Sequence, residues 1–407
     1  MSPPIIHWIE ADLPCSAHWY SSSGLPPPSR VVIADDRMTA DAAFRLASEG
    51  TAMLWRGDFQ NARQLLQAMA RRIDRGVRKP QKKQTASASV PAITDLGMTN
   101  LFNSHRQAQA QRARSLGRLL IPLSAGFTIA LRRAPDIREA CSRAYGVAAE
   151  SIPESVADGT DATTVAVASL RELQGAIGAH EWRKKGVAVE ALGARIHPHY
   201  GVFAPIRSEY VGLVASAALP DKDVILDVAF DIGTGTGVLA AVLAQRGVRR
   251  IVATDMDQRA LACAIDNLSR LGYLEQVEVM HADLFPPGRA GLIVCNPPWL
   301  PARPSSPLEH AVYDPDSRML RGFLNELAAH LQPGGEGWLI LSDLAEHLGL
   351  RSRAELLAMI EVAGLIVLGQ LDAKPNHPRV ADTADILHAA RCKEVTTLWR
   401  LGVKQVR

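Results

Sequence analysis

The residues best suited to chemistry follow an apolar run that ends at residue 295: Asn296, Pro297, Pro298 and Trp299. A planar amino or amide nitrogen is a poor nucleophile because its lone pair is delocalised. The Asn296 side-chain oxygen and the Pro297 carbonyl can each accept one of its N–H groups, and the prolines preorganise those acceptors because they fix φ. Trp299 offers a flat face for stacking a base or an amide. We therefore expect these four residues to be catalytic, chiefly by positioning a nitrogen that receives a group.

A glycine-rich turn follows another apolar run and reads D-I-G-T-G-T-G over residues 231–237. Glycines remove the Cβ atoms that would keep a ligand away from the backbone. The G-x-G-x-G spacing differs from the G-x-G-x-x-G of dinucleotide sites, and an acidic residue before the turn suits a positively charged amino-acid group better than a phosphate. We expect five residues of this turn to hold such a ligand: Asp231, Gly233, Thr234, Gly235 and Gly237.

The next two apolar runs also lead into acidic residues. Asp255 can accept both ribose hydroxyl groups of a nucleoside, as acids at this position do in nucleotide-binding folds, and we include its neighbour Met256 in the same site. Asp283 can accept an adenine amino group, with Leu284 against the ring, and Asn296 is also counted among the contacts. A single loop acid is often merely solvated, but acids or glycines after three successive strands favour a nucleoside site.

From residue 224 onward, strands, turns and helices alternate, which is typical of a parallel sheet covered by helices on both faces. The carboxyl ends of parallel strands meet at one edge of such a sheet, so the strand ends described above are expected to share one crevice. We place this α/β domain at residues 199–407. Before it we expect a small α/β domain at 1–78, a flexible basic linker at 79–95 and a mixed, largely helical region at 96–198.

The composition limits the class of protein. A chain of 407 residues, 47% of them hydrophobic, can form two or three domains. No apolar run reaches the length of a membrane span, the N-terminus lacks a secretion signal, and the five cysteines lie far apart. We therefore expect a reduced, cytoplasmic protein with no membrane partner. His197 and His199 have no third ligand at a recognised spacing, so no metal is expected.

Basic residues are concentrated in one part of the chain. Twelve Lys/Arg and two Asp give the segment 61–120 a net charge of +10, against +3 for the whole chain. Such a segment suits a polyanionic partner, and we expect nucleic acid binding, with RNA, the ribosome or a translation factor as the partner. The alternative interpretation is a solvated linker with flanking helices.

Three segments together resemble class I S-adenosylmethionine-dependent methyltransferases of the small N-methyltransferase type: 231–237, 253–257 (A-T-D-M-D) and 296–299. This group includes the HemK-type glutamine N5-methyltransferases and the ribosomal RNA guanine-N2 and adenine-N6 methyltransferases. The resemblance covers about residues 200–400. It implies a Rossmann-like domain with a seven-stranded, mostly parallel sheet, and S-adenosyl-L-methionine as the cofactor.

A further likeness lies upstream of the glycine turn, where A-P-I-R-S-E at residues 204–209 is similar to the corresponding segment of the glutamine enzymes. It implies that four residues, with Trp299, line the cofactor or target pocket: Phe203, Arg207, Ser208 and Glu209. Trp299 stands where the glutamine enzymes usually have Tyr and the guanine enzymes often have Phe.

These observations favour an N-methyltransferase that acts on a base amino group of ribosomal RNA. The basic segment and the additional α/β domain favour RNA, and a base inside a duplex would have to flip out to reach Trp299. The segment around Arg207 favours a protein glutamine instead, as in N5-methyltransferases of release factors or ribosomal proteins, and a small molecule is a third option. A non-catalytic RNA-binding module on the same fold is an alternative from another class of function.

Overall fold

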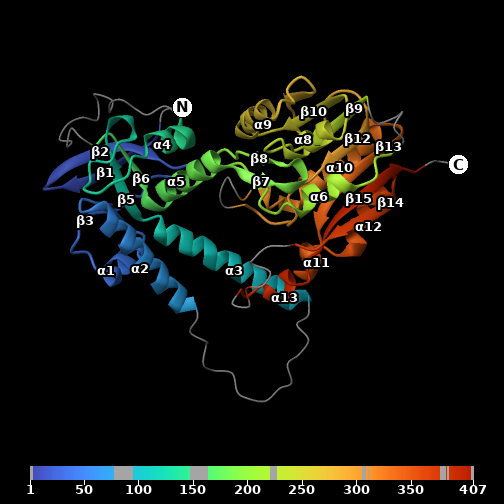
Figure 1. The fold of residues 1–407 in the computed structure, drawn as a ribbon. Helices are drawn as coiled ribbons and strands as arrows, with labels where there is room; N and C mark the ends of the chain where they lie inside the picture. Colours follow the sequence, from blue (N-terminus) through green and yellow to red (C-terminus); the bar gives the residue numbers. More distant parts are fainter. Residues whose placement is uncertain are drawn as a thin grey trace, which may run out of the picture. The chain divides into compact units, whose positions relative to one another are not determined.

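The computed structural model describes residues 3–77, 95–146, 164–220, 227–304, 309, 311–375, 382 and 385–404 (Figure 1). These residues form two compact units, one within 1–91 and 105–181, the other within 92–104 and 182–407. The linker expected at 79–95 lies outside the described residues except for Asp95, which begins a helix. None of the described helices combines the length and the apolar character needed to cross a membrane.

The first unit is built on a six-stranded sheet with the order β1-β2-β6-β5-β4-β3 (Figure 1). Its strands are β1 Ile5–Glu10, β2 Leu13–Tyr20, β3 Val31–Ala34, β4 Ala52–Trp55, β5 Leu119–Leu123 and β6 Ala166–Ser169. Its helices are α1 Ala40–Ser48, α2 Phe59–Val77 and α4 Arg138–Tyr145, and the helices α3 Asp95–Leu116 and α5 Leu170–Lys185 each have one end in this unit. Within the residues where we expected a small α/β domain, β3, α1, β4 and α2 follow one another, and Thr39 caps α1 by accepting from Ala42 N at 3.2 Å.

Two strands of this sheet, β5 and β6, come from the region that we expected to be largely helical, so the compact unit extends far beyond residue 78. Strand β5 is hard to predict from the sequence because Pro122 interrupts its apolar run, and a proline inside a run of residues argues against a strand. The ladder explains why this proline is tolerated. Strand β5 pairs with β4 only through Leu119 and Leu120, so Pro122 lies beyond that ladder and needs no N–H toward β4.

The second unit contains a seven-stranded sheet with the order β11-β10-β9-β12-β13-β15-β14, and the expected α/β fold class is confirmed. Its strands are β9 Val228–Ile232, β10 Arg250–Asp255, β11 Val277–His281, β12 Ala290–Cys295, β13 Leu331–Ser342, β14 Leu365–Ala373 and β15 Thr396–Val403. Its helices are α6 Glu209–Ser216, α8 Val238–Gln245, α9 Gln258–Leu271, α10 Arg318–His330, α11 Leu344–His347, α12 Arg353–Val362 and α13 His388–Arg391, and a hairpin of β7 Val187–Val189 and β8 Ala194–Ile196 precedes them. Strands β9 to β13 pair in parallel, whereas β15 is antiparallel to both of its neighbours.

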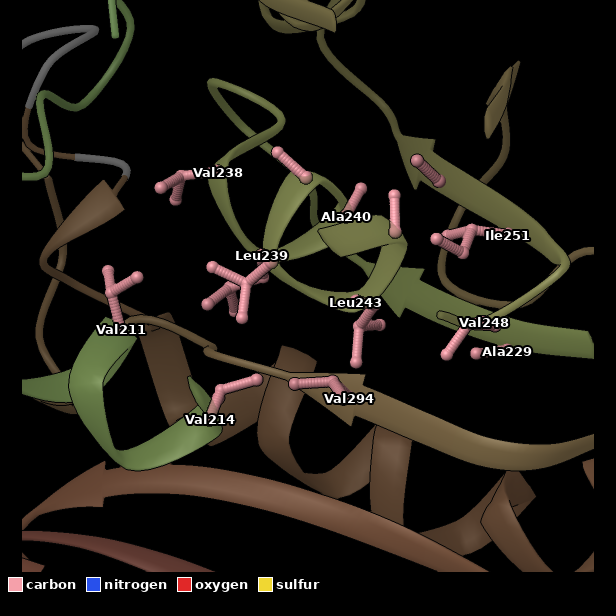
Figure 2. Close-up of a cluster of buried hydrophobic side chains, with 14 of the residues drawn as sticks. Val211, Val214, Ala229, Val238, Leu239, Ala240, Leu243, Val248, Ile251 and Val294 are labelled. Atoms are coloured by element: carbon pink, nitrogen blue, oxygen red, sulfur yellow. The ribbon is translucent and has the colours of Figure 1, made fainter. Parts of the chain in front are cut away.

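Apolar side chains cover both faces of this sheet. Because side chains alternate between the faces of a strand, neighbours such as Val294 and Cys295 belong to different clusters. One cluster lies under α6, α8 and α9, and Figure 2 shows α6 and α8 packed over the strands. The other lies under α10 and α12. Helix α8 is apolar on all sides, and each residue from Val238 to Ala244 is buried.

The strand order reverses between β9 and β12. From β9 the chain proceeds outward through β10 to β11, and it then returns to the other side of β9 as β12. In open α/β sheets, ligands bind at the carboxyl ends of the strands beside such a switch point. A ligand site is therefore expected at the carboxyl ends of β9, β10 and β12.

Candidate functional site

The register of the sheet brings the predicted strand ends together. Ile232 of β9 lies opposite Thr254 of β10 on one side and Cys295 of β12 on the other. Gly233, Asp255 and Asn296 each follow one of these residues, on neighbouring strands that lie about 4.8 Å apart. The glycine turn, the ribose acid and the asparagine predicted from the sequence therefore meet at one edge of the sheet.

The glycine turn is hydrogen-bonded to the end of β10 through its backbone N–H groups. The N–H groups of Gly233 and Thr234 both donate to the Thr254 carbonyl, at 2.9 and 2.8 Å, and the Gly235 N–H donates to Asp255 Oδ2 at 3.0 Å. Gly233, Gly235 and Gly237 have φ of +73°, +55° and +78°, a region that favours glycine. The turn then leads directly into α8, with Gly237 as its N-cap.

A methyl group would meet different surroundings at each glycine. At Gly233 it would lie 2.6 Å from the Met319 Cε atom of α10, and at Gly237 it would lie 3.2 Å from the Ala264 Cα atom of α9. At Gly235 it would meet no atom within 4 Å. Packing against the α9 backbone therefore restricts Gly237, whereas a methyl group at Gly233 would have to displace only the end of the flexible Met319 side chain, and Gly235 leaves open space above the turn.

Asp231 lies beneath the turn and is almost completely buried. Its Oδ2 atom accepts from the Thr234 hydroxyl at 2.7 Å and from the Ala240 N–H at 3.1 Å, in the first turn of α8. Burial raises the pKa of Asp231 to about 6, and these two hydrogen bonds oppose the rise. Asp231 thus organises the turn and brings a negative charge to it above that pH.

Asp255 is tied into its own loop but keeps acceptor capacity. Its Oδ1 atom accepts from Asp257 N at 2.9 Å, and Oδ2 accepts from Gly235 N. A carboxylate oxygen offers more than one lone pair, so both oxygens can accept further hydroxyl donors. Burial raises the pKa of Asp255 as well. The next residue, Met256, is 61% exposed and offers an apolar surface beside this acid.

Asp283 and Leu284, the predicted adenine contacts, both contact α10 in the structure. The exposed Asp283 carboxylate pairs with Arg318 at the start of α10. The Leu284 side chain packs over Gly322 of α10, and its backbone has the unfavourable φ of +76°, held by a 2.6 Å hydrogen bond from Thr254 Oγ1 to the Leu284 carbonyl. The segment is fixed between β10 and α10, and the Asp283 carboxylate already has a charged partner.

The four residues predicted to be catalytic follow β12. The buried Cys295 is the last residue of the strand, Pro297 is also buried, and Asn296 and Pro298 are partly exposed. The Trp299 indole Nε1 atom donates to Asn296 Oδ1 at 2.9 Å. The Trp299 ring is partly buried and packs against the apolar clusters of both sheet faces.

The segment before α6 contributes charged groups to the same end of the sheet. The Arg207 guanidinium lies 6.0 Å from the centre of the Trp299 ring and pairs with the buried Glu394 at 2.7 Å. Ser208 is the N-cap of α6 but makes no side-chain capping bond, and Phe203 is partly exposed. Glu209 begins α6, and its buried Oε1 atom has no hydrogen-bond partner among the described residues.

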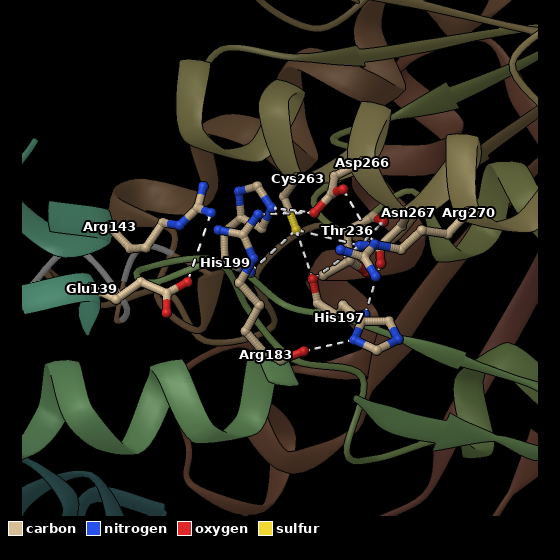
Figure 3. Close-up of polar contacts among 10 residues, drawn as sticks. All are labelled: Glu139, Arg143, Arg183, His197, His199, Thr236, Cys263, Asp266, Asn267 and Arg270. Carbon is tan, nitrogen blue, oxygen red and sulfur yellow. Dashed lines mark hydrogen bonds and ion pairs between the residues drawn. The ribbon is translucent and has the colours of Figure 1, made fainter. Parts of the chain in front are cut away.

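Sequence reasoning missed Asn267, a buried residue of α9. Its amide nitrogen donates to the Thr236 carbonyl in the glycine turn at 3.1 Å, and its oxygen accepts from the His197 N–H at 2.7 Å (Figure 3). One side chain therefore ties the turn to the segment before α6. The signal in the sequence is a polar residue on the apolar face of a helix, which has to find partners when it is buried.

A network around Asp266 fastens the same segment to α9. The Asp266 carboxylate accepts from His199 Nε2 at 3.0 Å and from Arg183 at 2.9 Å (Figure 3). Cys263 accepts from the His199 N–H, and burial raises the pKa of this thiol to about 11. The histidines of the His197-Pro-His199 sequence therefore serve packing. Across the described part of the chain, no group of three or more His, Cys, Asp or Glu side chains is arranged to hold a metal ion.

Comparison with known families gives one match for this unit, the methyltransferase small domain, over residues 194–359. Residues of the chain are 31% identical over 185 positions to the release factor glutamine methyltransferase of Cereibacter sphaeroides, covering 41% of this chain and 63% of that protein. They are 35% identical over 118 positions to the tRNA1(Val) (adenine(37)-N6)-methyltransferase of Pedobacter heparinus, covering 27% of this chain and 50% of that protein. The chain thus spans between half and two thirds of the length of these curated relatives.

A solved methyltransferase structure from Pyrococcus furiosus is 19% identical, covers 56% of this chain and 98% of its own, and has a TM-score of 0.36.

Proposed function

The second unit is a class I methyltransferase domain of the small-domain family, and from that premise we propose that this protein is an S-adenosylmethionine-dependent N-methyltransferase acting on a planar amino or amide nitrogen. The observation that carries the proposal is the register that places Asn296 directly beside the glycine turn. An acceptor for a substrate N–H and an open nucleoside cradle then share one edge of the sheet.

The residues at this edge fit S-adenosylmethionine. Gly235 leaves open space above the turn, where a side chain would intrude. The buried Glu209 oxygen, which lacks a partner among the described residues, is suited to the cofactor's ammonium group. Asp255 is suited to the ribose hydroxyls, and the exposed Met256 to the adenine ring.

Each residue of the proposed active site has a physical task. The cofactor, when bound, supplies an electrophilic methyl group. Asn296 Oδ1 and the Pro297 carbonyl accept the substrate N–H groups and direct the nitrogen lone pair, and Pro297 and Pro298 keep these acceptors fixed. The methylated nitrogen is acidic enough to lose its proton to solvent, so this scheme uses no general base. Positioning provides most of the rate enhancement.

For the substrate we propose a base amino group of RNA, most simply ribosomal RNA. The basic segment supports this choice, since Arg71, Arg75 and Arg114 on α2 and α3 are exposed. Exposed arginines suit phosphate contacts, which provide the sequence-independent part of RNA affinity. The first unit is then the part of the chain that binds RNA outside the target nucleotide.

A protein glutamine is the second candidate substrate. It is supported by the identity with a release factor glutamine methyltransferase and by Arg207 and Glu209, which follow the pattern of the glutamine enzymes. Both candidates present a planar nitrogen to Asn296, so the chemistry at the strand end is the same. They differ in the macromolecule that carries this nitrogen.

Methyl transfer from tritiated S-adenosylmethionine to a lysate of a strain that lacks the gene tests the proposal. We expect the wild-type chain to label material that ribonuclease destroys and protease spares, and Asn296→Ala to lose labelling while cofactor affinity stays within about twofold, because Asn296 acts on the substrate. Protease-sensitive label would favour glutamine over RNA. Absence of cofactor binding by calorimetry at millimolar concentration would contradict the enzyme and favour a binding module.

A further inference from the structure

The hydrogen bond between Trp299 and Asn296 determines which way the catalytic amide faces. An indole N–H can only donate, so the amide atom that it meets at 2.9 Å must be the oxygen and not the nitrogen. An amide oxygen has two lone pairs, so one is still available for a substrate N–H after Trp299 has used the other. Without this contact, the amide can rotate by half a turn and present its own N–H groups in place of the oxygen.

Trp299 is itself held on one side by a charged group. The Arg207 guanidinium lies 6.0 Å from the centre of the ring, within the range of a cation–π contact. The Arg207 side chain is only 18% exposed, so water screens the contact weakly. Packing against both apolar clusters of the sheet restricts the ring further.

Arg207 is fixed in turn by a buried carboxylate from the far end of the sequence. Glu394 lies two residues before β15, and its side chain is fully buried. Its Oε1 atom accepts from Arg207 at 2.7 Å and from the Ser342 hydroxyl, at the end of β13, at 2.8 Å. A buried carboxylate with such partners holds a guanidinium far more rigidly than a surface ion pair does.

We propose that Trp299 is a positioning residue that keeps the Asn296 oxygen directed at the substrate nitrogen, and that Arg207 and Glu394 hold Trp299 in that position. The inference rests on the proposed function. A flipped amide would place an N–H donor against the N–H donors of the substrate, which blocks the approach of the nitrogen. The tryptophan thus contributes through its N–H as well as through its ring.

The direct test replaces Trp299 by Phe, which keeps a ring and removes the N–H. We expect the methyl-transfer rate at saturating lysate from the gene-deletion strain to fall about 100-fold, as for the loss of one oriented polar group, while the cofactor dissociation constant changes less than twofold. The matched control is Trp338→Phe, since the Trp338 indole also donates to a side chain, Glu336, at 3.0 Å, but inside the sheet. That variant is expected to lose stability and to keep its transfer rate at a temperature well below its melting point.

A second measurement separates orientation from structural support. Asn296→Asp has an oxygen in both positions, so a half-turn rotation changes nothing. The rate penalty of Trp299→Phe should therefore be several-fold smaller when Asp replaces Asn296 than in the wild-type background. An equal penalty in both backgrounds would overturn the inference.

Arg207→Lys keeps the charge for Glu394 but loses the planar group above the ring. We expect it to slow transfer several-fold in the wild type and to have no further effect once Trp299→Phe is present, because residues that act through one another are not additive. Additive losses would overturn the role of Arg207.

A readout independent of activity is the indole ¹⁵N–¹H resonance of Trp299, identified by its disappearance in Trp299→Phe. It should move upfield in Asn296→Ala, because the hydrogen bond is lost, and an unchanged shift would contradict the contact. If the wild type and Trp299→Phe transfer methyl groups at equal rates, this inference is overturned but the proposed function is not. A wild-type chain that binds no cofactor contradicts the proposed function itself.

Discussion

Gly235 and Gly272 have the same backbone constraint but different surroundings. Both have positive φ, of +55° and +78°, and at both a methyl group would meet no atom within 4 Å. Gly235 faces the proposed nucleoside cradle, whereas Gly272 ends α9 as its C-cap. The pair therefore separates the cost of strain from the cost of blocking a ligand.

We predict that Gly235→Ala and Gly272→Ala each lower the free energy of unfolding by about 1 kcal/mol, the cost of a non-glycine residue in the left-handed region. Only Gly235→Ala is expected to weaken cofactor binding, by at least about tenfold, because its methyl group occupies ligand space. Denaturant unfolding and calorimetry measure the two effects. Equal cofactor affinities in the two variants would remove Gly235 from the site.

The pKa of Asp231 leads to a prediction about pH. Burial raises this pKa to about 6 in the free protein, and a cation bound nearby favours the ionised form and lowers it. If the proposed cofactor binds with its positive charge near Asp231, we expect binding to release a proton around pH 6, so that cofactor affinity rises as the pH increases through this range and falls below it. Calorimetry between pH 5 and 8, in buffers of different ionisation enthalpy, reports both the affinity and the protons released.

The control for this prediction is Asp231→Asn, which has no proton to release. It should flatten the pH dependence near pH 6 and bind more weakly above that pH. A steep dependence that persists in Asp231→Asn would assign the titration to another group, such as Asp255, whose pKa burial also raises.

The residues that could be predicted from the sequence are those that directly follow an apolar strand. Gly233, Asp255 and Asn296 each follow an apolar strand directly, and the sheet register brings them together as expected. The partners of Glu394 and Asn267 could not be predicted, because they lie 187 and 70 positions away in the chain. Only the folded sheet brings such pairs into contact.

Among the elements, α9 supports the glycine turn from the side. Its apolar face packs on the sheet, and the buried Asn267 reaches both the Thr236 carbonyl and the His197 N–H. Figure 3 shows this side chain between the two segments. The helix thereby fixes the turn at a point that no backbone ladder reaches.

We predict that Asn267→Leu lowers the free energy of unfolding by about 1 to 3 kcal/mol, since it leaves the buried Thr236 carbonyl and the partly buried His197 N–H without this partner. Cofactor affinity should fall as well, because the turn becomes mobile. Ser269→Ala, an exposed change in the same helix, is the control and should change neither quantity. If Asn267→Leu matches the wild type in both, the turn does not depend on α9.

Among the elements, the alternation of strands and helices expected from residue 224 onward is present, and α9 also shows a local start signal. Asp257 caps α9 through a hydrogen bond to Arg259 N, and α9 spans residues 258–271. Prediction from the sequence failed for β5 and β6, which are short and do not alternate between polar and apolar residues. Every residue of both strands is buried, and a buried strand of four or five residues cannot be told from other apolar segments by period alone.

For the molecule as a whole, RNA binding is the property to be tested on the first unit. We predict that replacing Arg71, Arg75 and Arg114 by Gln weakens RNA binding and lowers the slope of log affinity against log salt by about 2 to 3, if each contacts one phosphate. Filter binding over a range of salt concentrations measures the slope. Two of these residues lie on α2 and one on α3.

The control for this experiment removes three exposed charges from the second unit, by Gln in place of Arg249, Arg250 and Lys404. An equal slope for the two triple variants would make the basic segment a solvated surface. The triple variant of the first unit should slow methyl transfer to intact ribosomal RNA more than it slows transfer to a short RNA that lacks the flanking sequence.

Strand β15 is translated after every other strand of its sheet, yet it lies between β13 and β14. Until it emerges from the ribosome, β13 and β14 have no partner between them and Arg207 has no Glu394 to pair with. A nascent chain stalled before residue 394 therefore lacks the ion pair that holds Arg207 beside Trp299. Ribosome-bound chains of this protein should therefore hold the Trp299 ring loosely until the last strand of the sheet has been synthesised.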